Sequence, residues 1–377
     1  MNNMSIFEEE ITERQSVKFI LDDSESLSLI NDIDFSKYQK SIVFCDEKLK
    51  NSIWHKVERK ISDLIIIKHV SFLHASEETK SIDNYSLLVG ELEENKCSRD
   101  DLIIVIGGGT ILDAISYLSS TYMRGIDLCM IPTTLIGQAD ASTAGKTCIN
   151  TNYGKNVLGT LFLPKYVYNN VSFLTSISKY ELRQGFSEIF KYGLLGSKHL
   201  INLMEKYQSS PTNELMLEIL RETINVRISI RKKDPLASNL GHTFGHALEK
   251  ISKYEVNHGD AISVGILMAL MFSHEEGLVS EKLKDNIASL INNFGLNSKI
   301  ESGVDPELLT KIMLTDKKSS NSEIRLVLIE DIGIPLKQSG SLFYPVKPNR
   351  MKSFLETFMC EEDLNAENHW EKLRNVN

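Results

Sequence analysis

The amino-acid sequence predicts an α/β domain built on a parallel sheet, followed by a mainly α-helical domain. In the first half, short runs rich in β-branched residues alternate with amphipathic stretches, as in SIVFCD, DLIIIKHV, DDLIIVIGGG and DLCMIPTT. Such alternation is typical of parallel strands joined by crossover helices. From about Lys179 onward, long stretches have helical periodicity, among them ELRQGFSEIFKYGLLG, NELMLEILRETINVRISIRKK and GDAISVGILMALMFSHEEG. We place the domain boundary near residue 170, with one domain at 1–170 and the other at 171–377.

Length and composition agree with two soluble domains. The 377 residues, 42% of them apolar, can form well-buried cores. A net charge of −9 argues against a nucleic-acid-binding surface, which needs an excess of Lys and Arg. The five cysteines are odd in number and widely spaced, which predicts no disulfide framework and favours a reducing cytoplasm. The N-terminus is too acidic for a signal peptide, and the apolar run ISVGILMALMF is far shorter than a span of about 20 residues, so we expect no membrane association.

The stretch IIVIGGGTILDAISYL, residues 103–118, is an apolar strand that runs through three glycines into a helix. Glycines at such a turn let backbone N–H groups approach a phosphate, whose charge the helix N-terminus favours. The pattern does not match GxGxxG, so a purely structural tight turn remains an alternative. Asp113, expected in the first turn of the helix, fits a ribose or dipole contact, or simply a helix start.

A second stretch, residues 130–159, is dense in small and polar residues. It contains Asp140, Lys146, Lys155 and Asn156. Lysines among Gly, Ser and Thr suit a phosphorylated ligand. The alternative interpretation is a solvated loop.

Acidic and histidine residues in the second half suggest a metal site. Glu188 and Lys191 are three residues apart on one helical face, for which a surface ion pair is the usual explanation. His242 and His246 are one helical turn apart, and His258 begins a new helix. Imidazole is the commonest zinc ligand, and Glu188 could complete a three-ligand site with an open position. Spacing alone favours His242 and His246 together as ligands, whereas histidines satisfied within the core are the alternative.

Seven motifs follow one another along the chain: GGGTILDAISYLSSTYMRGI, IPTTLIGQADASTAGKTCIN, YGKNVLGTLFLPK, RQGFSEIFKYGLL, NLGHTFGHALE, HGDAISVGI and DKKSSNSEIRLVLIEDIG. In order and approximate spacing they resemble the dehydroquinate synthase family of sugar-phosphate cyclases, from about Asp46 to Gly333. The resemblance implies an N-terminal Rossmann-like domain, a C-terminal helical domain and an active site in the cleft between them. It also implies a homodimer.

The resemblance further implies two cofactors. One divalent metal, zinc or cobalt, would be held by Glu188, His242 and His258, so that His246 faces the substrate instead. The implied NAD contacts are Asp46, Glu77, Lys80, Gly107, Gly108, Gly109, Asp113, Thr133, Thr134 and Lys155.

The implied substrate is a sugar phosphate, from which phosphate is eliminated before a carbocycle closes. The implied phosphate contacts are Lys146, Asn156, Asn239, a lysine of DKK (Lys317 or Lys318), and Arg124, which in the family reaches across a dimer interface. Asp140, Lys191 and Arg227, where the family usually has lysine, match groups that hold the substrate's hydroxyls and anionic end. The catalytic set implied is Lys146, Lys191, His246 and Asp140. The leading substrate is 3-deoxy-arabino-heptulosonate 7-phosphate, converted to 3-dehydroquinate.

Two departures from the family pattern concern the cofactor and the substrate. GGGTILD has Leu112 where the family has a glycine, next to the expected dinucleotide site. KKDPLASNLGHT lacks about six residues and the arginine that meets the substrate carboxylate, although Arg231, Lys232 and Lys233 lie just upstream. Three alternatives therefore stay open: a cyclase of a carboxylate-free sugar phosphate (sedoheptulose 7-phosphate or glucose 6-phosphate), a metal-dependent polyol dehydrogenase, and an inactive scaffold.

Overall fold

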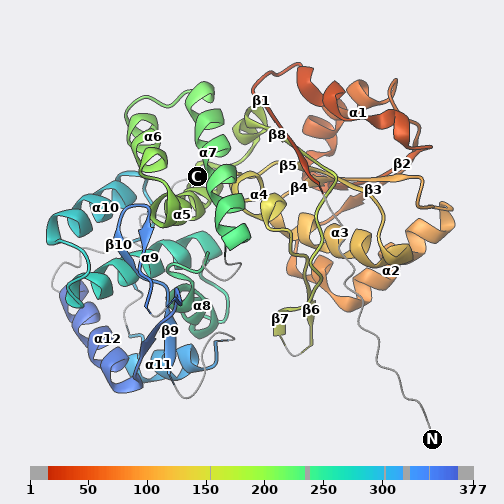
Figure 1. Cartoon of the computed structure of the whole chain (residues 1–377). Helices are drawn as coiled ribbons and strands as arrows, with labels where there is room; N and C mark the ends of the chain where they lie inside the picture. The colour runs from red at the N-terminus through yellow and green to blue at the C-terminus, as the bar shows by residue number, and fades with distance from the viewer. Residues whose placement is uncertain are drawn as a thin grey trace, which may run out of the picture.

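The computed structural model of this chain describes residues 16–152, 154–233, 238–300, 303–316, 323–338 and 340–363. An α/β half occupies one side of the molecule and a mainly helical half the other (Figure 1). This arrangement confirms the predicted fold class, because the sheet comes first along the chain and the long helices follow. The exact domain boundary near residue 170 stays a prediction.

Six parallel strands form the sheet, in the order β1, β8, β5, β4, β2, β3. Their bounds are β1 Lys18–Asp22, β2 Ser41–Asp46, β3 Ile67–Leu73, β4 Leu102–Gly107, β5 Leu128–Pro132 and β8 Tyr166–Asn170. Every residue of β2, β4, β5 and β8 is buried. Continuous burial is what central strands of a parallel sheet show when helices cover both faces.

Four of these strands correspond to the apolar runs identified in the sequence, although within DLIIIKHV the strand begins only at Ile67. The sequence does not indicate β1 and β8. The segment KFILD is short, and YVYNN mixes aromatic with amide side chains instead of forming an aliphatic run.

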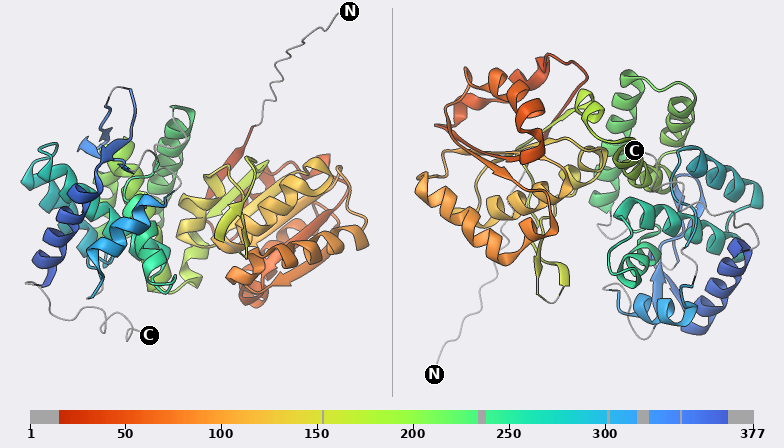
Figure 2. Two further views of the ribbon diagram at one scale, coloured as in Figure 1. Left: turned by 90° about the horizontal axis from the view of Figure 1, so that it is seen from below. Right: turned by 180° about the vertical axis from the view of Figure 1, so that it is seen from behind.

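Helices cover the sheet on both sides, as Figures 1 and 2 show. They are α1 His55–Ile61, α2 Ile82–Glu94 and α3 Gly109–Thr121. Successive side chains of a strand point to opposite faces, so each strand feeds two cores. Ile42 and Phe44 of β2 join the core with α2 and α3, whereas Val43 and Cys45 join the core with α1. The carboxyl edge of the sheet is left uncovered by these layers, and the loops that follow the strands lie there.

The segment 130–159 is not simply a solvated loop. It forms helix α4 (Leu135–Ala139), the 3₁₀ turn η7 (Ala141–Thr143) and a hairpin of β6 (Ile149–Thr151) and β7 (Gly154–Leu158). Leu135, Gln138 and Ala139 are buried, and α4 packs against α5 of the second half. The segment therefore joins the two halves at the carboxyl edge of the sheet.

The second half is a bundle of helices, with bounds α5 Lys179–Gly196, α6 Lys198–Ser209, α7 Asn213–Lys233, α8 His242–Ile251, α9 His258–Glu275, α10 Glu281–Asn293, α11 Pro306–Leu314 and α12 Pro348–Asp363. Helix α9 is buried almost all round, which explains its continuous apolar sequence. Within the described part of the chain, no helix is long and apolar enough to cross a membrane.

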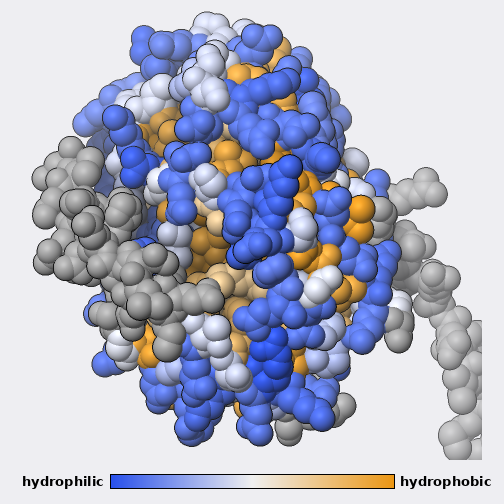
Figure 3. Space-filling view, turned by 90° about the vertical axis from the view of Figure 1, so that its left-hand side faces the viewer, coloured by the Kyte–Doolittle hydropathy of each residue, from blue (hydrophilic) through white to orange (hydrophobic). Residues whose placement is uncertain are grey.

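Four short strands were not expected in this half: β9 Ile324–Leu326, β10 Ile329–Asp331, β11 Ile334–Pro335 and β12 Tyr344–Val346. They pair antiparallel, β9 with β12 and β10 with β11. The face of this half that is turned away from the sheet is mostly hydrophilic, with apolar side chains visible in the hollows (Figure 3).

Helices α8 and α9 approach each other backbone to backbone through glycines. A Cβ added to Gly265 of α9 would lie 2.1 Å from the carbonyl oxygen of Gly241, and one added to Gly245 of α8 would lie 3.0 Å from that of Ala261. Gly241 also has a φ of +75°, which favours glycine. This close approach holds the first residues of α8 and α9 near each other.

Replacing Gly265 by alanine is expected to destabilise the fold by roughly 1–3 kcal/mol, because the added methyl group meets backbone that cannot rotate away. Denaturant unfolding measures the free energy. Gly90→Ala is the matched control: Gly90 lies in α2 with nothing within 4 Å of the added carbon, so alanine's helix propensity should stabilise the protein by about 0.5–1 kcal/mol. Wild-type stability in Gly265→Ala would contradict this close packing.

Candidate active site

Three side chains from different helices of the second half converge on one point. Glu188 lies in the middle of α5, His242 is the first residue of α8 and His258 the first residue of α9. Glu188 Oε1 is 3.5 Å from His242 Nε2 and 3.3 Å from His258 Nε2. One ligand atom of each residue lies within 4.8 Å of the others. This spacing suits a single metal ion.

The far nitrogens of both imidazoles are held by acceptors. His242 Nδ1 donates to the carbonyl oxygen of Leu240 at 3.1 Å, and His258 Nδ1 donates to Glu249 Oε1 at 3.0 Å. A carbonyl or carboxylate oxygen only accepts, so each Nδ1 carries a hydrogen, and each Nε2 is the ring nitrogen that faces Glu188. Oriented histidines of this kind are typical of metal ligands. An oxygen and two imidazole nitrogens form a donor set that fits zinc or cobalt.

Negative charge at this point favours a cation. Burial would raise the pKa of Glu188, but the charge of Lys191 and the hydrogen bond from His258 outweigh burial and hold that pKa well below its usual value. Burial would lower the pKa of His258, but Glu188 and Glu249 raise it to about 10. The carboxylates that favour a proton on His258 would equally favour a divalent metal ion.

His246 lies beside this group and not in it. Its side chain is 44% exposed, and Nδ1 is 3.5 Å from Asp316 Oδ2. Its ring centroid is 5.3 Å from that of His242. The geometry therefore favours the ligand set implied by the family resemblance over the pairing of His242 with His246 that spacing alone suggested.

Lys191 connects the metal group to a second cluster. Its Nζ donates to Glu188 and lies 3.8 Å from Asp140 Oδ1. The expectation of a surface ion pair is wrong, because the side chains of Lys191 and Glu188 are only 2% and 0% exposed. Asp140 also accepts hydrogen bonds from Arg227 and from the hydroxyl of Tyr192. Because it is buried, the pair of Glu188 and Lys191 forms part of the candidate site.

Tyr192 is a site residue that the sequence does not indicate. Lys191 Nζ lies 4.3 Å and Arg227 Cζ 5.3 Å from the centroid of its ring, so its aromatic face meets two cations. The only sequence signal is its position next to Lys191. Arg227 Nε is buried and has no hydrogen-bond partner among the described residues, which leaves one donor for a ligand.

Positive charge accumulates around Asp140. Desolvation and the charges of Arg227 and Lys191 lower the pKa of Lys146. Desolvation and Arg227 likewise lower the pKa of Arg231, which packs over Gly145. The repulsion between these cations adds to the effect of desolvation, and a bound anion would relieve it.

A second group of predicted residues lies at the carboxyl ends of β2 and β4. From β2 the chain continues to β3 on one side, while β4 and β5 lie on the other. Ligands of open α/β sheets bind at such a reversal of strand order. Asp46 ends β2, and Gly107 ends β4 so close by that a Cβ on the glycine would be 3.5 Å from Asp46 Cβ. The N-terminus of α3 at Gly109 opens onto the same edge.

Lys80 is the centre of a polar group at this edge. It is buried, and Nζ donates to Asp113 at 2.8 Å and to Asn156 Oδ1 at 2.7 Å. Burial would lower the pKa of Lys80, but Asp113 outweighs burial and raises it. The placement of Asp113 in the first turn of α3 is wrong, since α3 begins at Gly109 and has no acidic residue in that turn. Asn156, expected at the substrate phosphate, contacts the predicted NAD group through Lys80.

The remaining predicted residues are distributed as follows. The side chain of Thr134 caps α4 through Gly137, and the amide of Thr133, which is buried, donates to Gly107. Glu77 accepts from Asn150 and lies 3.6 Å from Lys155. The carbonyl oxygen of Asn239 accepts from the amide of His242, at the start of α8.

One predicted substrate contact, Arg124, is not brought into the site, and another falls outside the described residues. Arg124 follows the C-terminal end of α3, about 20 Å along this helix from Gly109 at 1.5 Å per residue. Lys317, with Lys318 beside it, lies outside the described residues, as do residues 234–237 of the shortened segment.

Comparison with known proteins agrees with this geometry. The family model described as 3-dehydroquinate synthase N-terminal matches residues 70–184, and the one described as 3-dehydroquinate synthase C-terminal matches residues 185–319. The chain belongs to the dehydroquinate synthase family. A 3-dehydroquinate synthase of Helicobacter pylori (strain G27) is 35% identical over 273 residues, 70% of this chain and 78% of that protein. One of Francisella tularensis subsp. tularensis (strain WY96-3418) is 32% identical over 295 residues, 75% of this chain and 80% of that protein.

Solved structures share the fold at lower identity. A 2-deoxy-scyllo-inosose synthase complexed with carbaglucose-6-phosphate, NAD⁺ and Co²⁺ has a TM-score of 0.81 at 22% identity, covering 90% of this chain and 96% of that one. The 2-epi-5-epi-valiolone synthase of Streptomyces hygroscopicus subsp. jinggangensis 5008, with NAD⁺ and Zn²⁺ bound, has a TM-score of 0.82 at 20% identity, covering 95% and 100%. Glycerol dehydrogenase of Schizosaccharomyces pombe has a TM-score of 0.64 at 14% identity, covering 98% and 95%.

Family and fold thus carry different information. The fold occurs in cyclases and in dehydrogenases alike. Membership of the dehydroquinate synthase family is what supports a sugar-phosphate cyclase of that type, and it confirms the resemblance identified from the seven motifs.

Proposed function

We propose that this chain is a sugar-phosphate cyclase that uses NAD and one divalent metal, zinc or cobalt, to eliminate phosphate and close a carbocycle. Its leading reaction is the conversion of 3-deoxy-arabino-heptulosonate 7-phosphate to 3-dehydroquinate. The enzyme would be a carbon–oxygen lyase acting on phosphates. The named relatives support this reaction type.

The position of Lys191 carries the proposal. Its buried ammonium group joins the Glu188 carboxylate of the candidate metal group to Asp140, around which the cations gather. A substrate held here would present its hydroxyls to the metal and its anionic groups to Lys146 and Arg227. A cyclase needs both in one cleft, because the same molecule is oxidised and loses phosphate.

Both proposed cofactors fit the residues present. Glu188, His242 and His258 would hold the metal, and the edge formed by Asp46, Gly107–Gly109 and the N-terminus of α3 would hold NAD. When bound, NAD supplies a reversible hydride acceptor and the metal a Lewis acid for two hydroxyl groups.

The chain's own side chains would bind the substrate and move protons. His246 Nδ1 faces Asp316, which leaves Nε2 available to accept a proton and to assist departure of phosphate. The lowered pKa of Lys146 favours proton exchange with an anionic oxygen. Lys191, fixed by two carboxylates, would orient substrate hydroxyls, and Asp140 would hold Arg227 and Tyr192 in place.

A carboxylate-bearing substrate needs a cationic partner, and α7 can supply it. Arg227 has an unused donor at Nε, and Arg231 follows one helical turn later. We therefore propose that these two arginines replace the arginine that is missing from the shortened segment before α8. The alternative is a substrate without the carboxylate, such as sedoheptulose 7-phosphate or glucose 6-phosphate.

We also propose a homodimer. Arg124 lies too far from its own site to serve it, and apolar side chains are exposed around it. Met123 is 45% and Leu161 83% exposed, and the hydrogen bond from Thr160 Oγ1 to Ser120 Oγ brings their segments together. Burial of these residues against a second copy would let Arg124 reach the partner's site. Within the described part of the chain, Cys45, Cys97, Cys129 and Cys148 are unpaired, which fits a reducing cytoplasm as the proposed location.

The enzyme is expected to release phosphate in the presence of NAD without accumulating NADH, because the hydride taken early is returned in the same turnover. Phosphate release and absorbance at the NADH band, measured together over a panel of sugar phosphates, test this. Stoichiometric NADH without phosphate would instead support the polyol dehydrogenase alternative. Neither product, with metal and NAD added, would support the inactive scaffold.

A further inference from the structure

The connection between α8 and α9 has an unusual backbone. Lys253 and Tyr254 are consecutive non-glycine residues in the left-handed region, with φ values of 54° and 66°. Such conformations cost free energy and persist where surrounding contacts impose them. The amide of Tyr254 donates to the carbonyl oxygen of Glu249 at 2.6 Å, which ties Tyr254 to the end of α8.

The ring of Tyr254 faces a lysine from the other half of the molecule. Lys155 Nζ, on β7, lies 4.1 Å from the ring centroid of Tyr254 and 3.6 Å from Glu77 Oε2. The first distance is that of a cation–π contact. Glu77 and Lys155 both belong to the predicted NAD set. One lysine is thus shared between the nucleotide side of the cleft and the connection between α8 and α9.

The connection also leads to a metal ligand. The carbonyl oxygen of Glu249 accepts the hydrogen bond from the amide of Tyr254, and its carboxylate accepts one from His258 Nδ1 at 3.0 Å. Lys155, Tyr254, Glu249 and His258 therefore form a contiguous series of contacts from β7 to the candidate metal group. We propose that Tyr254 is a positioning residue that couples occupancy of the nucleotide site to the geometry of the metal ligands.

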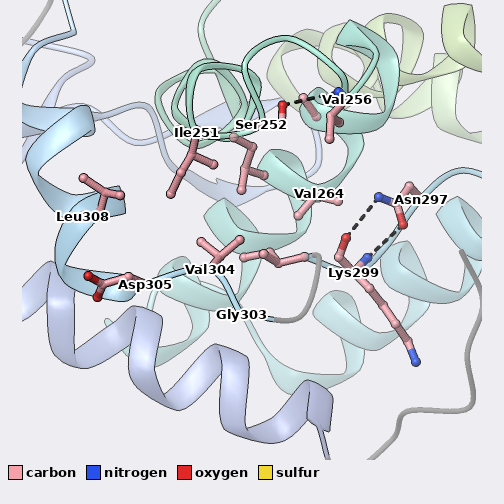
Figure 4. Close-up of a pocket in the computed structure, with 13 residues that line it drawn as sticks. Ile251, Ser252, Val256, Val264, Asn297, Lys299, Gly303, Val304, Asp305 and Leu308 are labelled. Carbon is pink, nitrogen blue, oxygen red and sulfur yellow. Dashed lines mark hydrogen bonds between the residues drawn. The ribbon is translucent and has the colours of Figure 1, made fainter.

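A cavity borders the connection and gives it room to move. The cavity has a volume of about 310 Å³ and is lined in part by Ile251, Ser252 and Val256 (Figure 4). A segment that borders a cavity is held less firmly by packing than one within a close-packed core. The contact between Tyr254 and Lys155 then holds the connection, and a nucleotide bound beside Glu77 would act on it through Lys155.

The inference rests on the proposed function, since it requires NAD near Glu77 and a metal at His258, but binding measurements test it without turnover. The dissociation constant for Co²⁺ is measured by competition with a chromophoric chelator, with and without saturating NAD. In the wild type, NAD should tighten Co²⁺ binding roughly two- to fivefold, the size of one exposed cation–π contact. By linkage, Co²⁺ should tighten NAD binding by the same factor.

Variants of Tyr254 and Lys155 separate loss of the coupling between NAD and Co²⁺ from loss of the folded structure. Tyr254→Phe keeps the aromatic ring and should keep the coupling, whereas Tyr254→Leu should bind Co²⁺ alone as the wild type does and lose the NAD effect. Lys155→Gln, measured at saturating NAD, should also lose the effect of NAD on Co²⁺ binding. This variant replaces Tyr254→Leu in the test if Tyr254→Leu does not fold. Independent binding in the wild type, weaker Co²⁺ binding with NAD, or undiminished coupling in Tyr254→Leu would each overturn the inference. Intact coupling without phosphate release would overturn the proposed function alone.

Discussion

Alanine at Glu188, His242 or His258 is expected to abolish metal binding and turnover, whereas alanine at His246 should abolish turnover alone. Each of the first three removes one of three protein ligands, and Glu188→Ala also removes the carboxylate to which the buried Lys191 donates. His246 points its Nδ1 at Asp316 and lies outside the group. Metal content after dialysis and phosphate release give the two readouts.

A graded control strengthens this test. Glu249→Gln keeps the shape of the side chain that orients His258 but removes its charge, and it should weaken metal binding about 10- to 100-fold without abolishing it. Thermal unfolding of each variant separates loss of ligands from loss of fold. Equal metal loss in all four alanine variants would refute the assignment of His246 to the substrate.

Arg227→Ala is expected to lower kcat/KM for the keto acid phosphate by roughly 30-fold to several thousand-fold, the equivalent of the 2–5 kcal/mol that an unpaired buried charge costs. The variant removes the donor at Nε and leaves Asp140 with one cation fewer. Arg227→Lys is the matched control, because it keeps the charge at this position and the family usually has lysine there. Phosphate release from the keto acid phosphate, with the two neutral-ended sugars alongside, is the measurement.

Two outcomes separate the substrates. Efficient turnover of the keto acid phosphate that depends on Arg227 would exclude the carboxylate-free alternative. Turnover of a neutral-ended sugar only, unaffected by Arg231→Gln, would contradict the leading substrate. If Arg231→Gln lowers turnover of the keto acid phosphate and Arg227→Ala does not, the carboxylate is bound one helical turn further along α7.

The sequence predicts those parts of the fold whose burial follows from a local pattern of apolar residues. The aliphatic runs at β2, β4 and β5 and the periodicity of α5, α7 and α9 are of this kind. The sequence does not indicate β8, because the polar groups of Tyr168 and Asn170 are satisfied by Asp22 at the end of β1 and by Ser24 just after it. That burial depends on partners far away in the chain, which no local pattern reveals.

The candidate site divides in the same way. The family motifs predicted the set Glu188, His242 and His258, which the structure brings together, although their role as ligands awaits the test above. The sequence does not indicate Tyr192 or Glu249, because each contributes to the site only through a contact that folding brings about. Spacing alone predicts a surface position for Lys191, which is wrong for the same reason. The separation of two residues along a helix does not tell whether other elements cover the face they share.

The pairing of β1 with β8 has a consequence for synthesis. Tyr168 Oη donates to Asp22 at 2.6 Å across 146 residues of chain. At a translation rate of about 5–20 residues per second, the first strand waits roughly 7–30 s for its neighbour to be made. Until then one side of β5 remains an open strand edge, the kind of surface on which nascent chains aggregate. Fragments that end before residue 166 should therefore be insoluble or bound by chaperones, and the α/β half can complete its sheet only when the ribosome has already begun the helical half.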